Sequence, residues 1–213
     1  MHSGRIAIVW NPAKTSREDF EAALPADMAG TALSWHETSP DDPGLGAADE
    51  ALATGAGVVV AAGGDGTVRA VAERLARDDA AAELVIAPLG TGNLLARNLG
   101  IPLGDLAGAL SRAFEGESRP LDLGWVEAEI DGVRMRRAFV VMAGFGIDAH
   151  MIVETDEDLK SKVGWLAYVE SLGRALRASK VVETDLAVDG EEPERKEAHT
   201  LLIGGCGTLQ GGV

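Results

Sequence analysis

A short segment that mixes glycines with one acid is the part of this sequence best suited to chemistry. Gly63–Thr67 reads Gly-Gly-Asp-Gly-Thr and places a single carboxylate, Asp65, among the glycines. Glycines let a backbone approach a phosphate closely, and the free N–H groups at the start of a helix bind anions. Because a carboxylate is unfavourable beside a phosphate, we expect Asp65 to hold Mg²⁺, directly or through water, or to take a proton from an attacking hydroxyl. The alternative is that Asp65 only caps the helix that follows, since Asp is a favoured N-cap residue.

A second glycine turn, Pro88–Asn93, follows another short apolar run and reads Pro-Leu-Gly-Thr-Gly-Asn. Two such turns at neighbouring strand ends can hold one nucleotide from both sides. Thr91 and Asn93 would then supply neutral hydrogen bonds to a ribose or a phosphate. The pair Asn11-Pro12 ends an earlier apolar run, so we expect it at the same edge of the sheet. A plain turn is the alternative reading of Asn11-Pro12.

The elements that must position these turns alternate between strand and helix patterns. Continuous apolar runs bounded by glycine or proline are typical of strands buried on both faces of a parallel sheet. The sequence predicts strands over 5–10, 32–38, 57–62 and 84–88, and a connector over 39–46. It also predicts three helices: one that starts near Ser16, one over 67–77 and one over 103–114. This alternation predicts an α/β domain with a parallel sheet covered on both sides, whose carboxyl edge is where such sheets bind ligands.

The pattern changes near Arg119, where hairpin signals replace the alternation. Asp131-Gly132 is a strong hairpin signal, and we expect Asp189-Gly190 to start a second hairpin. The sequence predicts extended runs over 120–130, 133–143 and 182–188, a returning strand over 199–204, and a helix over 162–179. We therefore expect a boundary near 118–122, between an α/β domain over 1–120 and a mainly antiparallel β domain over 121–213.

Composition and charge narrow the classes of function. The net charge is −15 with no basic arm, which argues against a nucleic-acid partner because such binding needs Lys and Arg. A single cysteine excludes an internal disulfide framework, and the sequence shows neither a membrane-spanning apolar stretch nor a signal peptide, so we expect a cytoplasmic protein. The four histidines lack metal-ligand spacing, and the P-loop, the dinucleotide fingerprint and the serine nucleophile elbow are missing. The sequence leaves the oligomeric state open, a homodimer included.

In this order, the motifs resemble the diacylglycerol-kinase-type catalytic family, which includes bacterial diacylglycerol and related lipid kinases, sphingosine kinases and ceramide kinases. The resemblance covers nearly the whole chain. It rests on Asn11-Pro12, Gly63–Thr67, Pro88–Asn93, Leu121–Gly124, Gly144–Ala149, Lys162–Tyr168 and Gly204–Thr208. The first glycine turn is shared with NAD kinases, whereas its combination with the later motifs is specific to the lipid kinases.

The resemblance implies ATP-dependent transfer of the γ-phosphoryl group to a lipid hydroxyl with Mg²⁺, most simply to diacylglycerol in phospholipid biosynthesis. The nucleotide would lie between the domains, the second domain would take the lipid, and the enzyme would visit the inner face of the membrane. Asp65 and Asp122 match catalytic and metal-network acids of the family, and Asp148 matches an acid near the lipid headgroup. The alternatives are that Asp122 caps a turn and that Asp148 starts a helix. The positions matched to nucleotide contacts are Asn11, Pro12, Gly63, Gly64, Gly66, Thr67, Gly90, Thr91 and Asn93.

Three departures from the family pattern matter. Leu94 stands where many members carry an acid, and Gly205 stands where members often have Asn. Family chains also continue past the position of Val213, so we expect this chain to be truncated and its second domain incomplete. An NAD kinase-like small-molecule kinase and a non-catalytic nucleotide-binding module remain alternatives, and the lipid headgroup is left open.

Overall fold

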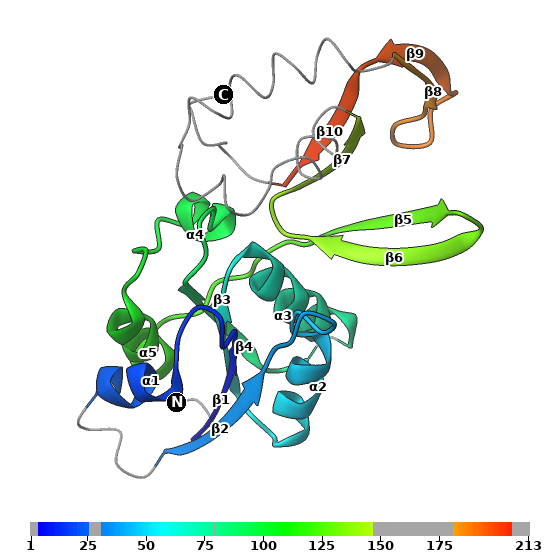
Figure 1. The fold of residues 1–213 in the computed structure, drawn as a ribbon. Coiled ribbons are helices and arrows are strands. Elements are labelled where there is room, and N and C mark those ends of the chain that lie inside the picture. The colour runs from blue at the N-terminus through cyan, green and yellow to red at the C-terminus, as the bar shows by residue number, and fades with distance from the viewer. Residues whose placement is uncertain (1–3, 26–30, 79, 147–180, 206–213) are drawn as a thin grey trace. The chain divides into compact units, whose positions relative to one another are not determined.

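The computed structural model describes residues 4–25, 31–78, 80–146 and 181–205 (Figure 1). The contacts divide the chain into two compact units, Met1–Val141 with Gly205–Val213, and Met142–Gly204. The boundary expected near 118–122 lies before the first hairpin, whereas the contacts group that hairpin with the first unit. Among the helices in the described ranges, none has the length and apolarity that crossing a membrane requires.

A four-stranded parallel sheet forms the centre of the first unit. Its strands are β1 (Arg5–Trp10), β2 (Ala32–Glu37), β3 (Val58–Gly63) and β4 (Glu83–Pro88), in the order β2-β1-β3-β4. Every residue of β3 is buried, as its continuous apolar run predicts for a central strand covered on both faces. The prediction of an α/β fold with a parallel sheet, followed by antiparallel strands, is therefore confirmed.

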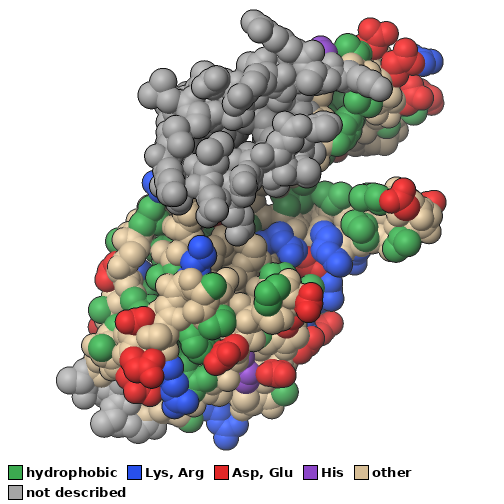
Figure 2. Space-filling view, in the orientation of Figure 1, with side chains coloured by type: hydrophobic (Ala, Val, Ile, Leu, Met, Phe, Trp, Pro, Cys, Tyr) green, Lys and Arg blue, Asp and Glu red, His purple; other side chains and the backbone are tan. Residues whose placement is uncertain are grey.

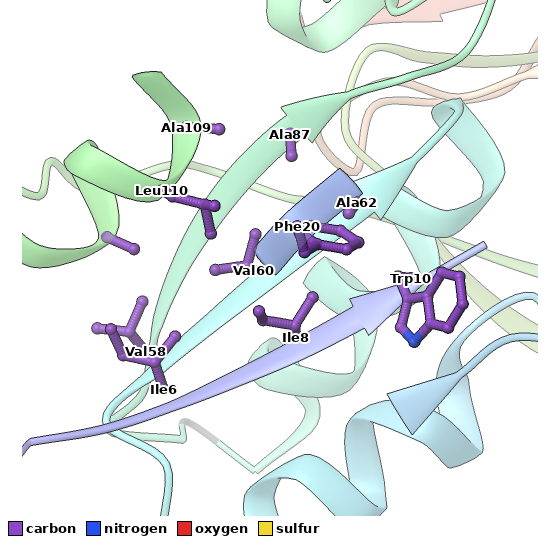
Figure 3. Packing of buried hydrophobic residues seen from close by; sticks show 11 residues of the cluster. Ile6, Ile8, Trp10, Phe20, Val58, Val60, Ala62, Ala87, Ala109 and Leu110 are labelled. Atoms are coloured by element: carbon purple, nitrogen blue, oxygen red, sulfur yellow. The ribbon is translucent and has the colours of Figure 1, made fainter. Parts of the chain in front are cut away.

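Helices cover both faces of this sheet (Figure 1). The helices α1 (Arg17–Ala23) and α5 (Leu106–Glu115) lie on one side, and α2 (Leu45–Ala53) and α3 (Asp65–Arg77) lie on the other. Under α1 and α5, Phe20 and Leu110 are fully buried, and Phe20 stands edge-on between Trp10 and Trp35. Figure 3 shows this core, to which β1 and β3 contribute Ile6, Ile8, Trp10, Val58, Val60 and Ala62.

The start of α1 agrees with the sequence analysis. The Ser16 hydroxyl accepts a hydrogen bond from the Asp19 N–H at 3.2 Å, and the Asp19 carboxylate accepts one from the Ser16 N–H at 2.9 Å. This reciprocal pair is a capping box. The hydrogen bonds from the Ser16 hydroxyl and backbone lower the pKa of Asp19.

Helix α2 was not expected from the sequence, which placed a connector over 39–46. Asp42 makes the helix start here, because its carboxylate accepts hydrogen bonds from the N–H groups of Gly44, Gly46 and Ala47 at 3.0, 3.1 and 3.0 Å. Burial by itself raises the pKa of Asp42, but these hydrogen bonds outweigh it and the pKa is lowered. The apolar face of α2 consists of alanines, whose weak contrast with their neighbours hides the helical period.

The first hairpin pairs β5 (Gly124–Ile130) with β6 (Val133–Phe139). Asp131 and Gly132 join the strands with φ of +52° and +77°, as the mirror-image two-residue turn requires. Ion pairs from Glu127 occupy one face of the hairpin, and exposed hydrophobic side chains lie along the other (Figure 2). Ile130 and Val133 at its tip are 54% and 62% exposed.

The second unit is antiparallel, but its pairing differs in part from the prediction. Asp189-Gly190 does form a hairpin, which joins β8 (Val182–Leu186) to β9 (Glu194–Ala198). The strand predicted over 199–204 is present as β10 (Thr200–Gly204), but it pairs with β7 (Met142–Gly146) instead of β8. The largely charged β9 gave no apolar alternation in the sequence, so it was missed. The helix predicted over 162–179 lies outside the described residues.

Candidate functional site

The two glycine turns meet at the carboxyl edge of the parallel sheet. Gly63 and Pro88, which end β3 and β4, are register partners, and the Leu89 N–H donates to the Gly63 carbonyl at 2.9 Å. A Cβ added to Gly90 would lie only 2.5 Å from the Cα of Gly64. The backbones of the two turns are therefore in direct contact, and a side chain at Gly90 would separate them.

Asp65, the first residue of α3, ties the two turns together. One oxygen of its carboxylate accepts a hydrogen bond from the Asn93 N–H at 2.8 Å, and the other accepts one from the Leu94 N–H at 2.6 Å. These N–H groups belong to the start of the short helix α4 (Leu94–Asn98), so Asp65 caps α4 and not its own helix. A Cβ added to Gly92 would lie 2.7 Å from the same carboxylate, so this glycine makes room for Asp65.

Asn93 closes the second turn with its own side chain. Its backbone is left-handed, with φ +49° and ψ +45°, a conformation that Asn tolerates better than most residues. Its Oδ1 accepts a hydrogen bond from the Gly90 N–H at 2.9 Å, and its Nδ2 donates to the Gly90 carbonyl at 2.6 Å. Because Asn93 is only 6% exposed and its amide is used within the turn, the structure shows it as a part of the site's framework.

The outer surface of the turns offers backbone donors. Among the described residues, no side chain caps the N-terminus of α3, so its first N–H groups are available to an anion. Within the described part of the chain, the N–H groups of Thr91 and Gly92 likewise have no hydrogen-bond partner. Gly66 is exposed, and nothing lies within 4 Å of a Cβ built on it. Thr67 is buried instead, with its side chain packed against the backbone of Gly63.

Asn11 lies at the same edge of the sheet. Its N–H donates to the carbonyl of Ala62 in β3 at 3.0 Å, and its Oδ1 accepts a hydrogen bond from the Ala13 N–H at 2.9 Å. The side chain thus closes its own turn, while the adjoining Pro12 is exposed. The structure brings Asn11 next to the first glycine turn, as expected.

The two acids expected to act at the metal ion, Asp65 and Asp122, differ in their exposure and in their hydrogen-bond partners. Asp65 is engaged by two N–H groups, whereas Asp122 is exposed in the segment before β5 and has no hydrogen-bond or ion-pair partner among the described residues. In the same ranges, no group of three or more His, Cys, Asp or Glu side chains could hold a metal. Asp148, expected near the lipid, lies outside the described residues.

A fully buried carboxylate, Glu73, lies about two turns further along α3 than Asp65, and the sequence patterns did not mark it. It lies on α3 between Arg69 and Arg77, with Oε2 2.5 Å from an Arg69 nitrogen and Oε1 bonded to Arg77. The same Oε2 accepts a hydrogen bond from the Ala138 N–H of β6 at 3.1 Å. Burial by itself raises the pKa of Glu73, but the Ala138 N–H and the two guanidinium groups outweigh it and the pKa is lowered. Glu73 thus anchors α3 to β6, and we call it the anchor of α3. The sequence signal for it was the spacing of Arg69, Glu73 and Arg77 at intervals of about one helical turn.

Comparisons with known proteins find lipid kinases among the similar proteins. A curated relative named probable lipid kinase YegS-like, from Pseudomonas aeruginosa (strain PAO1), is 39% identical over 170 residues, which are 79% of this chain and 53% of the relative. A relative named diacylglycerol kinase, from Bacillus subtilis, is 32% identical over 192 residues, or 88% of this chain and 60% of the relative. The chain thus spans between about half and three fifths of the length of these relatives.

Solved structures show the same fold. A putative diacylglycerol kinase from Bacillus anthracis str. Sterne superposes with a TM-score of 0.70 at 22% identity, covering 98% of this chain and 68% of that chain. The family model described as diacylglycerol kinase catalytic domain matches residues 5–126, which include both glycine turns and Asp122. Because this match covers more than half of the sequence, the chain belongs to the diacylglycerol kinase catalytic domain family.

Proposed function

We propose that this chain belongs to a lipid kinase that transfers the γ-phosphoryl group of ATP to a lipid hydroxyl, with diacylglycerol as the first acceptor to test. The observation that supports this proposal most directly is the contact between Gly64 and Gly90. This contact brings two sets of unpaired backbone N–H groups to one edge of the sheet, where they can surround a polyphosphate. Relatives named as lipid and diacylglycerol kinases point to the same chemistry.

In the reaction, an oxygen of the lipid hydroxyl attacks the γ-phosphorus, the bond to the bridging β–γ oxygen breaks, and ADP leaves. The backbone donors of the two turns would hold and orient the phosphates, which is the main task of a protein in phosphoryl transfer. Gly66, with open space above it, would let a phosphate come close to the start of α3. The hydroxyl proton leaves with a base or with solvent.

Magnesium fits this site as a companion of ATP. Mg²⁺ is commonly bound by one or two carboxylates together with substrate phosphates and water, and Asp122 is an exposed carboxylate without a partner among the described residues. Asp122 would therefore hold the ion or its bound water. When bound, the ion would neutralise charge on the phosphates. We also keep Asp148 as the proposed contact to the lipid headgroup, and the membrane surface as the place where the acceptor is met.

The proposal is tested by phosphate transfer from γ-labelled ATP to diacylglycerol, sphingosine and NAD⁺ in parallel, the lipids being presented in mixed micelles. We expect a labelled lipid and no labelled NAD⁺. Labelling of NAD⁺ alone would show that the chain is a small-molecule kinase of the NAD kinase type. Binding of ATP without transfer to any acceptor would show a nucleotide-binding module, an outcome that Leu94, at the place of a frequent family acid, makes worth testing.

A further inference from the structure

We propose that Asp65 is a positioning residue, which locks the second glycine turn against the first, and that it is neither the group that takes the hydroxyl proton nor a ligand of magnesium. This inference rests on the proposed function for its kinetic consequence, but its structural part can be measured without any substrate. The role of Asp65 is then to hold the shape of the site.

The two oxygens of the carboxylate are already used. They accept hydrogen bonds from two successive N–H groups, those of Asn93 and Leu94, at 2.8 and 2.6 Å. To turn toward a substrate hydroxyl or a metal, Asp65 would leave two donors without partners at the start of α4, and a donor left unpaired in a buried place is costly. Asn93 is buried, so water does not readily replace the carboxylate there.

The hydrogen bonds of Asp65 complete a closed ring of contacts. Asp65 holds the backbone of Asn93, the side chain of Asn93 holds both backbone groups of Gly90, and Gly90 touches Gly64, which precedes Asp65. Between Gly90 and Asn93 the ring encloses the two residues whose N–H groups are unpaired in the described structure. The ring therefore fixes the direction of these donors before a ligand arrives.

The glycines of the second turn are consistent with this assignment. A Cβ at Gly92 would lie 2.7 Å from the carboxylate of Asp65, and a Cβ at Gly90 would lie 2.5 Å from the backbone of Gly64. Both positions are glycine because the first turn approaches them closely. A phosphate need not be invoked to explain either one.

The test compares Asp65→Asn, Gly92→Ala and the control Asp131→Asn. The Asn at position 65 replaces one accepting oxygen with an NH₂ group that cannot accept an N–H, whereas the Ala at position 92 keeps the carboxylate but pushes it away from α4. The control removes an exposed carboxylate at a hairpin turn, where Asn is equally suited to the positive φ. Circular dichroism first establishes that each variant is folded.

If Asp65 positions the turn, Asp65→Asn and Gly92→Ala both weaken ATP binding and raise the KM for ATP, roughly tenfold to a hundredfold, while kcat changes by less than about fivefold. Hydrogen exchange of the Asn93 and Leu94 amides becomes faster in both variants and stays unchanged in the control. Asp65→Glu, which can still accept, restores part of the protection.

A loss of kcat of about 10²–10⁴-fold in Asp65→Asn, with ATP affinity and amide exchange unchanged, would show a general base and overturn the inference. The inference would also be overturned if Asp65→Asn lowered the affinity for Mg²⁺ in the presence of ATP while the exchange of the two amides stayed unchanged. If the unsubstituted chain binds ATP but transfers no phosphate, the proposed function fails, while the exchange and binding comparisons still decide the role of Asp65. If it binds no ATP, the proposed function fails, and amide exchange of Asn93 and Leu94 in the ATP-free variants still decides the role of Asp65.

Discussion

Replacement of Glu73 offers a quantitative test of how α3 is held. In Glu73→Ala, the Ala138 N–H loses its acceptor, and because Ala138 is 3% exposed this costs about 1–3 kcal/mol. The side chains of Arg69 and Arg77 are 29% and 40% exposed, so water can replace part of what they lose, and each ion pair is worth at most about 1 kcal/mol. We therefore expect the free energy of unfolding to fall by about 2–4 kcal/mol.

The same anchor predicts a dependence on pH. The pKa of Glu73 is lower in the folded chain than its ordinary value, so the unfolded chain binds the proton first as the pH falls. The stabilisation by the ionised carboxylate is thus complete above the ordinary pKa of Glu and is lost as the pH falls through the folded-state value. Glu73→Gln keeps an oxygen for the Ala138 N–H but lacks the charge, so its deficit relative to the unsubstituted chain should shrink on acidification.

Urea unfolding followed by circular dichroism, at neutral pH and at a pH near 4, measures both effects. Glu127→Gln is the matched control, because Glu127 also has two arginine partners but is 51% exposed, and we expect a change within about 1 kcal/mol. Equal stability of Glu73→Ala and the unsubstituted chain would refute the anchor. A deficit of Glu73→Gln that grows as the pH falls would refute the assignment of a lowered pKa.

Three further substitutions test other parts of the structure. Gly66→Ala should leave the free energy of unfolding unchanged or raise it by up to about 1 kcal/mol, because space is open above this helical glycine. The same change should weaken ATP binding at least fivefold. A thermal melt measures the stability and calorimetry measures the ATP affinity, with Gly4→Ala as the control. Asp42→Ala should lower the free energy of unfolding by about 0.5–2 kcal/mol through loss of the cap on α2, and unchanged urea midpoints would contradict this. Phe20→Ala should cost about 3–5 kcal/mol and alter tryptophan fluorescence, since Phe20 is fully buried against Trp10; a melt within error of the unsubstituted chain would contradict that packing.

Much of the fold could be predicted because the central strands are unusually distinct. The short, continuous apolar runs of β1 and β3 are typical of strands that are buried on both faces of a sheet. The Asp131-Gly132 pair predicted its hairpin turn. Helix α2 was missed because its start depends on Asp42, whose side chain acts on residues further along the chain. The pairing of β10 with β7 was missed because it joins segments that are far apart in the sequence.

The site was located by its residues but not explained by them. The sequence marked both glycine turns, and the structure brings them into contact. It could not show that Gly90 and Gly92 accommodate the first turn, because a glycine that admits a phosphate and one that admits a neighbouring backbone look the same in a sequence. The bond from Asp65 to Asn93 was equally hidden, since it depends on β3 and β4 being neighbours in the sheet.

Helix α3 carries two tertiary attachments, and this limits how its length can vary. Asp65 in its first turn holds α4, and Glu73, about 12 Å further along the axis, holds β6. An insertion or a deletion of one residue between them would rotate one attachment by about 100° relative to the other. Either α4 or β6 would then lose its carboxylate partner. We therefore expect related sequences to differ in the residues between Asp65 and Glu73 but to keep the same number of residues between them.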